Sequence, residues 1–578
     1  MKKILKFLKP YTFWIILSTI CVFIQAMTNL YLPNVMSDII DKGVVIGNLD
    51  EVYNLGFRML YITFGAMLFN ILATYIASKV SSSYARDLRK KVYKKVQSFS
   101  LNEFNKINTS SLITRTTNDI TQVQNLVNMS LRMMVMAPLM CIGGLILALN
   151  TNLNLSIIFI IIIPLLMLFI FSLVKFIVPL FSKVQGLTDR INQVVREKLI
   201  GTKVIRAFTT EKLEKKKFEK ANKDIYDLSI KISNIMSILM PVIFFLTNIS
   251  SVIIVYMGSH LISDNVLEVG DMMAFMQYAM QVLFSILMVT MMFIMIPKAI
   301  VSGKRIGEVL DIEPKIKDGK RKMSVPQRGN IEFKNVSFRH ENSSEDVIHD
   351  MSFKINKGET VAIIGATGSS KTTILNLILR FYDVTKGKIL IGGEDVKDLS
   401  LKDIRDSIGY VPQKVTLFSG TIKSNILYGK HDASEEEITN ATKCAEGYEF
   451  ISKLEKQFDS HVAQGGTNYS GGQKQRISIA RALVKDADIY MFDDSFSALD
   501  YATDKKLRKN LKEYAKDKTV IIVAQRVSTV LNADKIIYID EGKIVDIGNH
   551  KELFKRCKEY KEIVLSQITL EEATKGNE

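Results

Sequence analysis

Six long apolar runs in the first 300 residues restrict the fold of this chain more than any other feature. The hydrocarbon core of a bilayer is about 30 Å thick, and an α-helix needs ~20 apolar residues to cross it. No charged residue lies near the middle of any run. We therefore expect an all-α bundle of six transmembrane helices. The runs are Tyr11–Pro33, Leu55–Ala77, Met133–Leu149, Leu155–Val178, Met240–Ile262 and Met272–Ile296.

The N-terminus leaves one alternative open. The basic start Met1–Pro10, followed by an apolar run, also fits a secretory signal peptide. No small-residue cleavage site is evident, and further apolar runs follow. A retained first transmembrane helix is therefore favoured.

The segments between the runs alternate in length and charge. Asp41–Asn54, Asn150–Asn154 and Ser263–Asp271 are short and hold a single basic residue, Lys42. The segments after the second and fourth runs are long and rich in lysine and arginine. Basic segments stay in the cytoplasm, so we expect these two segments and both termini there. Their length and polarity predict helices that continue beyond the bilayer toward a second domain.

Charge and cysteine content exclude other classes of protein. The net charge of +17 would suit a nucleic-acid partner, but many basic residues flank apolar runs and no nucleic-acid module is present. We therefore expect no nucleic-acid binding. The lack of charge deep in the apolar runs argues against a proton- or ion-coupled carrier. The four cysteines are scattered, without metal-ligand or disulfide spacing.

From about Gly329 the sequence is that of a soluble α/β domain, and it carries a phosphate-binding motif. The apolar run Thr360–Ile364 predicts a β-strand, and a helical pattern follows the motif. The motif nearly matches the P-loop GxxxxGK[ST], in which backbone N–H groups and a helix N-terminus hold phosphates, lysine neutralises charge and the hydroxyl ligates Mg²⁺. It consists of Gly365, Ala366, Thr367, Gly368, Ser369, Ser370, Lys371, Thr372 and Thr373, with Ser370 in place of the last glycine.

A second apolar run, Ile489–Phe492, ends in two carboxylates, Asp493 and Asp494. A carboxylate at the end of a buried strand is what a Mg²⁺-nucleotide site requires. The alternative is a buried strand that merely ends in a polar turn. The P-loop in the same domain disfavours that alternative.

Over nearly its whole length the chain resembles ATP-binding-cassette (ABC) exporters of the multidrug type. Tyr469–Arg476 resembles their signature motif, Val411–Gln413 their Q-loop and Ser497–Asp500 their D-loop. Leu112–Asp119 and Gly201–Phe208 resemble their cytoplasmic loops. In the family two halves pair, and each ATP lies between the P-loop of one half and the signature of the other. Short coupling helices in the cytoplasmic loops dock on the ATPase domains.

The resemblance implies ATP and Mg²⁺ as cofactors, and it assigns roles to residues. Lys371 would bind phosphates. Thr372, Gln413 and Asp493 would hold Mg²⁺, and Gln413 would also sense the γ-phosphate. The catalytic set would be Asp494, Gln525 and Gln413. His340 lies in the adenine-stacking region. The signature residues Ser470, Gly471, Gly472 and Gln473 would complete the partner's ATP site.

Four positions depart from the family pattern. Asp494 stands where a glutamate polarises the attacking water; its carboxylate is drawn back by ~1 Å, a displacement that can cost ~10²-fold in rate. Gln525 stands where a histidine is usual, and it cannot take a proton near neutral pH. His340 replaces tyrosine, and Ser370 replaces glycine. All four serve the nucleotide at this chain's own P-loop, whereas the signature is intact.

The sequence therefore predicts a multi-domain protein with a transmembrane domain at 1–315, a linker at 316–328 and an ABC nucleotide-binding domain at 329–578. We expect a half-transporter in the plasma membrane that exports small hydrophobic or amphipathic compounds. Its partner would be a different half with the consensus glutamate, so that hydrolysis occurs mainly at the site the partner completes. The alternatives are a homodimer, a dedicated peptide or lipid exporter, and an ATP-binding regulatory subunit with little net transport.

The distribution of basic residues makes a prediction about topology. In intact cells, a membrane-impermeant thiol reagent should not label a cysteine introduced between Gln97 and Thr114, because basic segments stay inside. A cysteine introduced in Asp41–Asn54 should be labelled and serves as the control. Labelling of the first segment from outside would overturn this topology.

Overall fold

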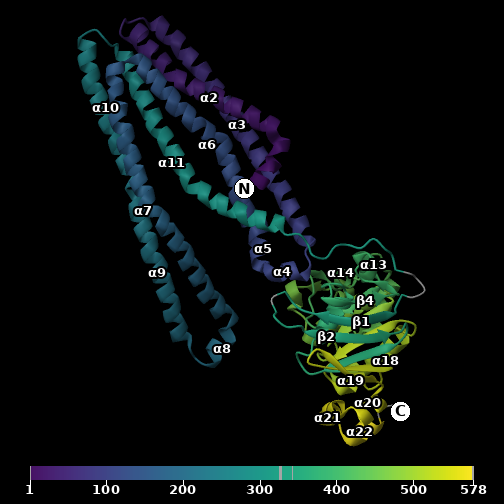
Figure 1. The fold of residues 1–578 in the computed structure, drawn as a ribbon. Helices are drawn as coiled ribbons and strands as arrows, with labels where there is room; N and C mark the ends of the chain where they lie inside the picture. The colour runs from purple at the N-terminus through teal and green to yellow at the C-terminus, as the bar shows by residue number, and fades with distance from the viewer. Residues whose placement is uncertain (1, 324–327, 342, 576–578) are drawn as a thin grey trace. The chain divides into compact units, whose positions relative to one another are not determined.

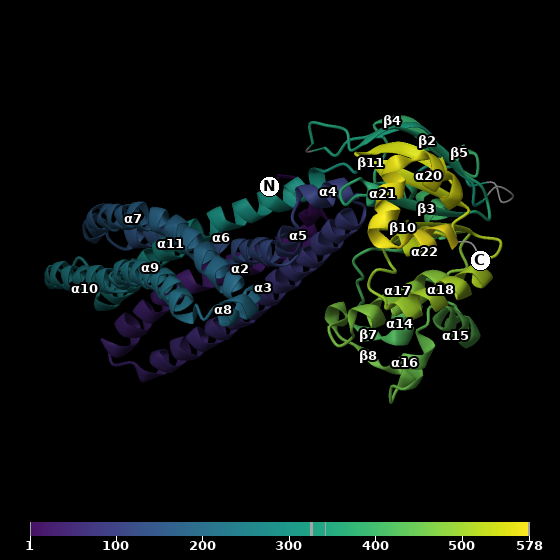
Figure 2. The same ribbon diagram turned by 90° about the horizontal axis from the view of Figure 1, so that it is seen from below.

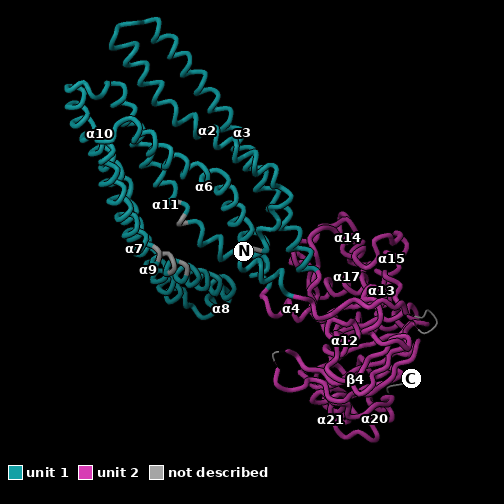
Figure 3. Tube along the Cα trace, turned by 45° about the horizontal axis from the view of Figure 1, so that its top comes forward, with its two compact units in different colours: residues 1–97, 109–312 teal, residues 98–108, 313–578 magenta. Residues whose placement is uncertain are grey.

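The computed structural model describes residues 2–323, 328–341 and 343–575. The chain divides into two compact units, which are described separately (Figure 3). Unit 1 comprises residues 1–97 and 109–312, and unit 2 comprises residues 98–108 and 313–578. Of the expected linker, residues 324–327 lie outside the described residues.

Six helices of unit 1 are long and apolar enough to cross a membrane, as the sequence predicted (Figure 1). Several extend well beyond a bilayer. α3 has 49 residues, which corresponds to about 70 Å at a rise of 1.5 Å per residue. This length agrees with the expectation that some helices continue beyond the bilayer. The spans lie in α2 (Thr12–Asp38), α3 (Leu49–Gln97), α6 (Asn118–Thr151), α7 (Leu153–Ile200), α10 (Leu239–Ser263) and α11 (Val269–Asp311).

Shorter helices join the spans. α1 (Lys2–Leu5) and η1 (Lys6–Tyr11) precede α2, and the π-helix η2 (Ile39–Val44) follows it. The two long basic segments are helical as well. They contain α5 (Thr109–Thr116), α8 (Thr202–Ala207) and α9 (Glu211–Ser237).

Some of the polar groups that unit 1 buries join its helices to one another. α6 packs against α11, and Ser302 Oγ of α11 donates a hydrogen bond to Asp119 Oδ1 of α6 at 2.7 Å. Large apolar side chains such as Phe57, Tyr61 and Phe171 point outward and remain exposed. Such a surface is stable only against lipid or another apolar partner.

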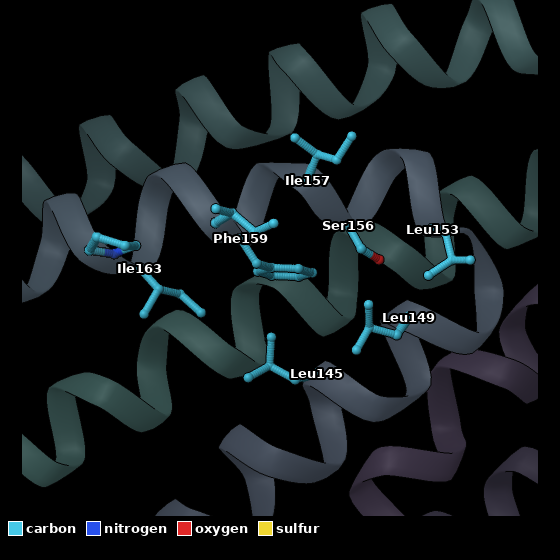
Figure 4. A pocket seen from close by; sticks show the side chains of 9 residues that line it. Leu145, Leu149, Leu153, Ser156, Ile157, Phe159 and Ile163 are labelled. Atoms are coloured by element: carbon cyan, nitrogen blue, oxygen red, sulfur yellow. The ribbon is translucent and has the colours of Figure 1, made fainter.

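An apolar cavity of about 450 Å³ lies between the end of α6 and the start of α7 (Figure 4). Leu145 and Leu149 of α6 line it together with Phe159 and Ile163 of α7. The hydroxyl of Ser156 also faces it but donates to the backbone oxygen of Asn152 at 2.8 Å. The cavity wall is therefore apolar in character.

A six-stranded sheet forms the centre of unit 2, in the order β12-β11-β3-β10-β9-β6. All neighbours pair in parallel except β11 and β12. Parallel sheets are covered on both faces, and this explains the nearly continuous apolar sequences of the inner strands. The strands are β3 (Thr360–Gly365), β6 (Ile408–Val411), β9 (Ile489–Asp493), β10 (Thr519–Ala524), β11 (Lys535–Asp540) and β12 (Lys543–Gly548).

Side chains on the two faces of this sheet belong to two separate cores. In β9, Ile489 and Met491 pack into one core and Tyr490 and Phe492 into the other, as the two-residue period of a strand requires. An antiparallel sheet, β2-β1-β4-β5, covers the first face. Helices including α14 (Ile422–Ile426), α15 (Glu435–Cys444), α17 (Gly471–Leu483) and α18 (Tyr501–Tyr514) lie on the other side (Figure 2).

The remaining elements of unit 2 complete these layers. The antiparallel sheet consists of β1 (Ile331–Phe338), β2 (Ile348–Ile355), β4 (Lys386–Ile391) and β5 (Glu394–Asp395). A small ribbon pairs β7 (Gly420–Thr421) with β8 (His461–Val462). The other helices are α4 (Leu101–Lys106), α12 (Lys371–Ile378), α13 (Leu401–Asp406), α16 (Tyr448–Ser452), α19 (Val527–Val530), α20 (His550–Arg556), α21 (Lys558–Gln567) and α22 (Leu570–Lys575).

Candidate nucleotide-binding site

Four neighbouring parallel strands bring the expected site residues to one edge of the central sheet. The register pairs Ile364 of β3 with Ala524 of β10, and Val523 of β10 with Asp493 of β9. Val411 of β6 lies opposite Phe492 of β9. The segments that follow these strands therefore emerge side by side at the carboxyl edge, where α/β folds bind their ligands.

The P-loop occupies the turn between β3 and α12. A glycine is required at position 365, because a Cβ there would lie 2.0 Å from the backbone oxygen of Ile539. Gly368 and Ser370 both adopt positive φ angles, +89° and +70°. Ser370 is the N-cap of α12 in the left-handed region, which costs an L-residue other than glycine roughly 1–2 kcal/mol. The serine found in the sequence therefore occupies a position that suits glycine.

Lys371 is 7% exposed, and its ammonium group lies inside the P-loop. It donates hydrogen bonds to the backbone oxygens of Gly365 at 2.9 Å and Ala366 at 2.7 Å. Burial lowers the pKa of this lysine, and the nearby charges of Asp494 and Asp493 oppose that shift. The lysine is thus held at the position where phosphate oxygens would need a positive charge.

Asp493 and Thr372 form a pair that fits Mg²⁺. The hydroxyl of Thr372 donates to Asp493 Oδ1 at 3.0 Å. Asp493 is 1% exposed, and its Oδ2 accepts no hydrogen bond from the part of the chain that the structure describes. Burial raises the pKa of this carboxyl group. A buried carboxylate oxygen without a partner, next to a hydroxyl, is the oxygen-rich donor set that Mg²⁺ prefers.

Asp494, Gln413 and Gln525, the three residues expected to form a catalytic set, are in contact with one another through Asp494. Asp494 Oδ2 accepts from Gln525 Nε2 at 3.1 Å and from Gln413 Nε2 at 3.4 Å. The backbone of Asp494 has a φ of +48°, a conformation that aspartate tolerates better than most residues. One carboxylate oxygen of Asp494 is therefore shared by two amide donors.

The signature residues lie at the start of α17, away from these contacts. The side chains of Ser470 and Gln473 form a capping box, in which Ser470 N donates to Gln473 Oε1 at 2.9 Å and Gln473 N to Ser470 Oγ at 3.3 Å. Gly471 and Gly472 follow in the first turn. Ser470 and Gly471 are exposed. This helix N-terminus therefore lies at the surface of unit 2, and a helix N-terminus is a favourable place for an anion.

The ring of His340, the residue expected in the adenine-stacking region, packs against two aromatic rings. Its ring lies edge-on to Phe338, at 4.8 Å and 83°, and to Tyr382, at 5.4 Å and 85°. Tyr382 was not singled out from the sequence, because it lies outside every motif. The two aromatic rings fix the orientation of the histidine ring.

The residue after His340 anchors α4, a contact that the sequence did not indicate. The Glu341 carboxylate forms ion pairs with Lys106 of α4 at 2.8 Å and with Lys315. The hydrogen bond from Lys106, and after it the one from Lys315, lowers the pKa of the Glu341 carboxyl group. Asn105 of α4 donates to the Tyr382 hydroxyl at 3.4 Å. The segment between the second and third spans is thereby joined to the side chains around His340.

α4 itself is formed by local sequence. Ser100 N donates to the Glu103 carboxylate at 2.7 Å as part of a capping box. Glu103 is buried, and its other oxygen accepts from Lys315 N at 3.4 Å. One acidic side chain therefore starts the helix and also ties it to the segment that enters the ATPase fold.

Comparisons with known proteins agree with this architecture. The family model "ABC transporter transmembrane region" matches residues 15–287, and "ABC transporter" matches residues 348–497. An uncharacterized ABC transporter ATP-binding protein of Bacillus subtilis is 39% identical, over 98% of this chain and 99% of its own length.

Relatives with more specific names are also similar over their whole length. A putative multidrug export ATP-binding/permease protein of Bacillus subtilis is 31% identical, over 98% of this chain and 99% of its own. An ATP-dependent lipid A-core flippase of Haemophilus influenzae is 30% identical, over 98% and 97%. The solved structure of a bacterial Atm1-family ABC exporter with ATP bound superposes with a TM-score of 0.81 at 25% identity, covering 96% of this chain and 98% of the other.

The strained position of Ser370 gives a stability prediction. Ser370→Gly should stabilise unit 2 by up to about 1 kcal/mol and tighten ATP binding, because glycine adopts positive φ without a steric penalty. Thermal melting and nucleotide titration would measure both effects. Ser369→Gly is the control, because position 369 has no positive φ and its hydroxyl is 3.3 Å from Lys371 Nζ; it should destabilise. A loss of stability in Ser370→Gly would show that the serine is not strained.

The ion pairs of Glu341 lead to a prediction about how substrate in the membrane unit stimulates ATP turnover. Glu341→Gln should change stability by less than about 1 kcal/mol, since exposed ion pairs contribute little, yet reduce substrate-stimulated ATP turnover several-fold. Glu332→Gln, which breaks an exposed pair with Lys334 in the same unit, should leave stimulation unchanged. Equal stimulation in both variants would mean that the α4 contact has no part in coupling.

Proposed function

The chain belongs to the ABC transporters, and on this premise we propose that it is one half of a heterodimeric ATP-driven exporter for hydrophobic or amphipathic compounds. Its two units are an exporter-type membrane half and an ABC ATPase domain. It is a multi-pass membrane protein of the multidrug or lipid exporter type. The plasma membrane, with both termini in the cytoplasm, is the location that we propose.

Unit 1 supports export of an apolar substrate. The middles of its spans carry no charge, so a substrate would meet apolar and hydroxyl groups there. The cavity between α6 and α7 has a volume of about 450 Å³, and its wall is apolar (Figure 4). Two similar proteins are named for multidrug export and for lipid A-core flipping. An amphipathic lipid-like or drug-like molecule agrees with all three observations.

Two physical observations support a second half. No hydrogen bond joins Ser470–Gln473 to the P-loop among the described residues, so the signature is available to a nucleotide held elsewhere. The tip around α8 also exposes apolar side chains that water would not tolerate as a free end. They include Leu199, Ile200, Val204 and Phe208, of which Ile200 is 80% exposed. We propose that the partner's ATPase unit covers this tip.

The environment of Asp494 is the observation that carries the heterodimer proposal. A general base must reach the proton that it abstracts. The Asp494 carboxylate is one methylene shorter than that of a glutamate, and two amide donors hold one of its two oxygens, which restricts how far it can reach. Neither glutamine can relay a proton. Lys371, Thr372 and Asp493 meanwhile keep the geometry of a phosphate and Mg²⁺ site, so this chain would hold ATP without turning it over rapidly.

Mg²⁺ would supply charge neutralisation between nucleotide phosphates and Asp493. Thr372 positions its hydroxyl by its hydrogen bond to that carboxylate. Lys371 stays directed into the loop by its backbone acceptors. At the partner's P-loop, the signature N-terminus of α17 would complete a competent site, with the water-activating glutamate supplied by the partner.

Alternative functions remain, and each has a distinguishing result. A homodimer with a slow Asp494 base would hydrolyse ATP at two equal sites. A dedicated peptide or lipid exporter would differ only in which substrate stimulates turnover. A regulatory subunit would bind ATP but show no substrate-stimulated hydrolysis in the paired complex.

The proposal predicts unequal effects of two mutations in the purified two-half transporter. Ser470→Ala should nearly abolish ATP turnover, because the hydroxyl serves the competent site. Asp494→Asn should do much less, because the site that it serves is already slow. The two effects should differ by at least about 10-fold, or about 1.4 kcal/mol in barrier height. Turnover is measured in matched preparations checked by size-exclusion chromatography.

A matched control separates catalysis from folding, since Ser470→Ala also removes a helix cap. Ser434→Ala removes the equivalent capping box of α15, where Ser434 pairs with Glu437. It should cost a similar stability, typically about 1 kcal/mol, and leave turnover near normal. If Asp494→Asn is as damaging as Ser470→Ala, Asp494 is a working base and the two sites are equivalent.

A further inference from the structure

Unit 2 has a cavity of about 770 Å³ at the edge of the central sheet opposite the P-loop. Gly358 and Thr360, which precede or begin β3, line it together with Val520 near the start of β10. The P-loop follows the other end of β3, about 17 Å away at 3.3 Å per residue. The cavity has the volume of a small-molecule site, and it is separate from the ATP site already described.

One wall of this cavity is a row of lysines on α18 and just beyond it. Lys505, Lys509 and Lys512 recur at a spacing of four and three residues, which places them on one face of the helix. Lys516 follows two residues after the helix ends. Within the part of the chain that the structure describes, none of these four side chains makes an ion pair or a side-chain hydrogen bond, and all four residues are exposed.

Among the other charged residues of the cavity lining, Arg508 has an ion-pair partner, since it contacts both oxygens of Asp504 at 3.1 Å. The carboxylate of Asp534 accepts from Thr360 N at 2.9 Å. Lys506 is a further exposed lysine of the lining without an ion pair among the described residues. The lysines therefore give one wall of the cavity positive charge that no ion pair compensates.

The floor of the cavity is apolar. Leu511, Val520 and Ile522 contribute to it, and each is almost fully buried. A cationic rim above an apolar floor fits a ligand that combines several negative charges with an apolar ring. Lysine ammonium groups are compact point charges that bind phosphates.

We propose that this cavity binds a nucleoside polyphosphate, with its phosphates on the lysines of α18 and its base on the apolar floor. α18 begins directly after Asp500, and β10, which supplies the floor, ends just before Gln525. The ligand would therefore contact the two elements that continue into the segments carrying Asp494 and Gln525. Its occupancy would change ATP turnover at the paired sites without contact to the P-loop.

The experiment separates this cavity from the P-loop by mutation. In the full chain, Lys371→Ala removes the P-loop charge, and binding of a fluorescent ATP analogue is then titrated. We expect residual saturable binding that the further change Lys509→Gln/Lys512→Gln weakens by about tenfold or more. Lys558→Gln/Lys561→Gln, which removes the same charge from the exposed residues of α21, should leave that binding unchanged.

Two competitors test the chemistry of the ligand. Unlabelled ATP should displace the analogue more strongly than inorganic tripolyphosphate, because only ATP has a base for the floor. Equal displacement by both, or equal loss in the α21 variant, would overturn the proposal in favour of general attraction of anions to a basic surface. Binding to phosphatidylglycerol vesicles without saturable nucleotide binding would overturn it as well, and would assign the lysines to a membrane surface.

Discussion

The pairing of three parallel strands, β3, β10 and β9, is the constraint on which the chemistry of this chain depends. Thr372 follows the first strand, Gln525 follows the second, and Asp493 ends the third. Their register brings the Thr372 hydroxyl to 3.0 Å from Asp493 and Gln525 to 3.1 Å from Asp494. A slip of one residue would turn every side chain of a strand to the other face. Such a slip would move the side chains of that strand from one core to the other. It would also separate Thr372 from Asp493 and Gln525 from Asp494.

The membrane half obeys a different constraint, because every backbone polar group in lipid must be satisfied internally. Long helices meet this requirement, and some of them are longer than the core of a bilayer is thick. α4 is the one piece between two spans that belongs to the compact ATPase unit. Its ion pair with Glu341 lies next to His340. Such an exposed pair adds little stability. Its effect is instead to fix the position of α4 beside the aromatic rings of Phe338, His340 and Tyr382.

The four departures from the family pattern act on one nucleotide site in different physical ways. Ser370 accepts a backbone conformation that suits glycine, and His340 is held edge-on by two rings. Asp494 adopts a positive φ and shares one oxygen between two amides. None of these features disturbs Lys371, Thr372 or Asp493. The contrast between these intact residues and the altered surroundings of Asp494 is the basis on which we propose a division of labour between two halves.

Sequence alone determined the six spans, the P-loop strand and helix, and the acidic end of β9, because each depends on short-range patterns. Apolar length specifies a span, and glycine spacing with lysine specifies a phosphate loop. Tertiary structure alone decided that Lys106 meets Glu341, that Tyr382 packs on His340, and that the lysines of α18 and Lys516 line one wall of a cavity. These groups are joined by strand register and helix packing across many residues. Local residue patterns carry no record of such distances, so only the folded chain could bring them together.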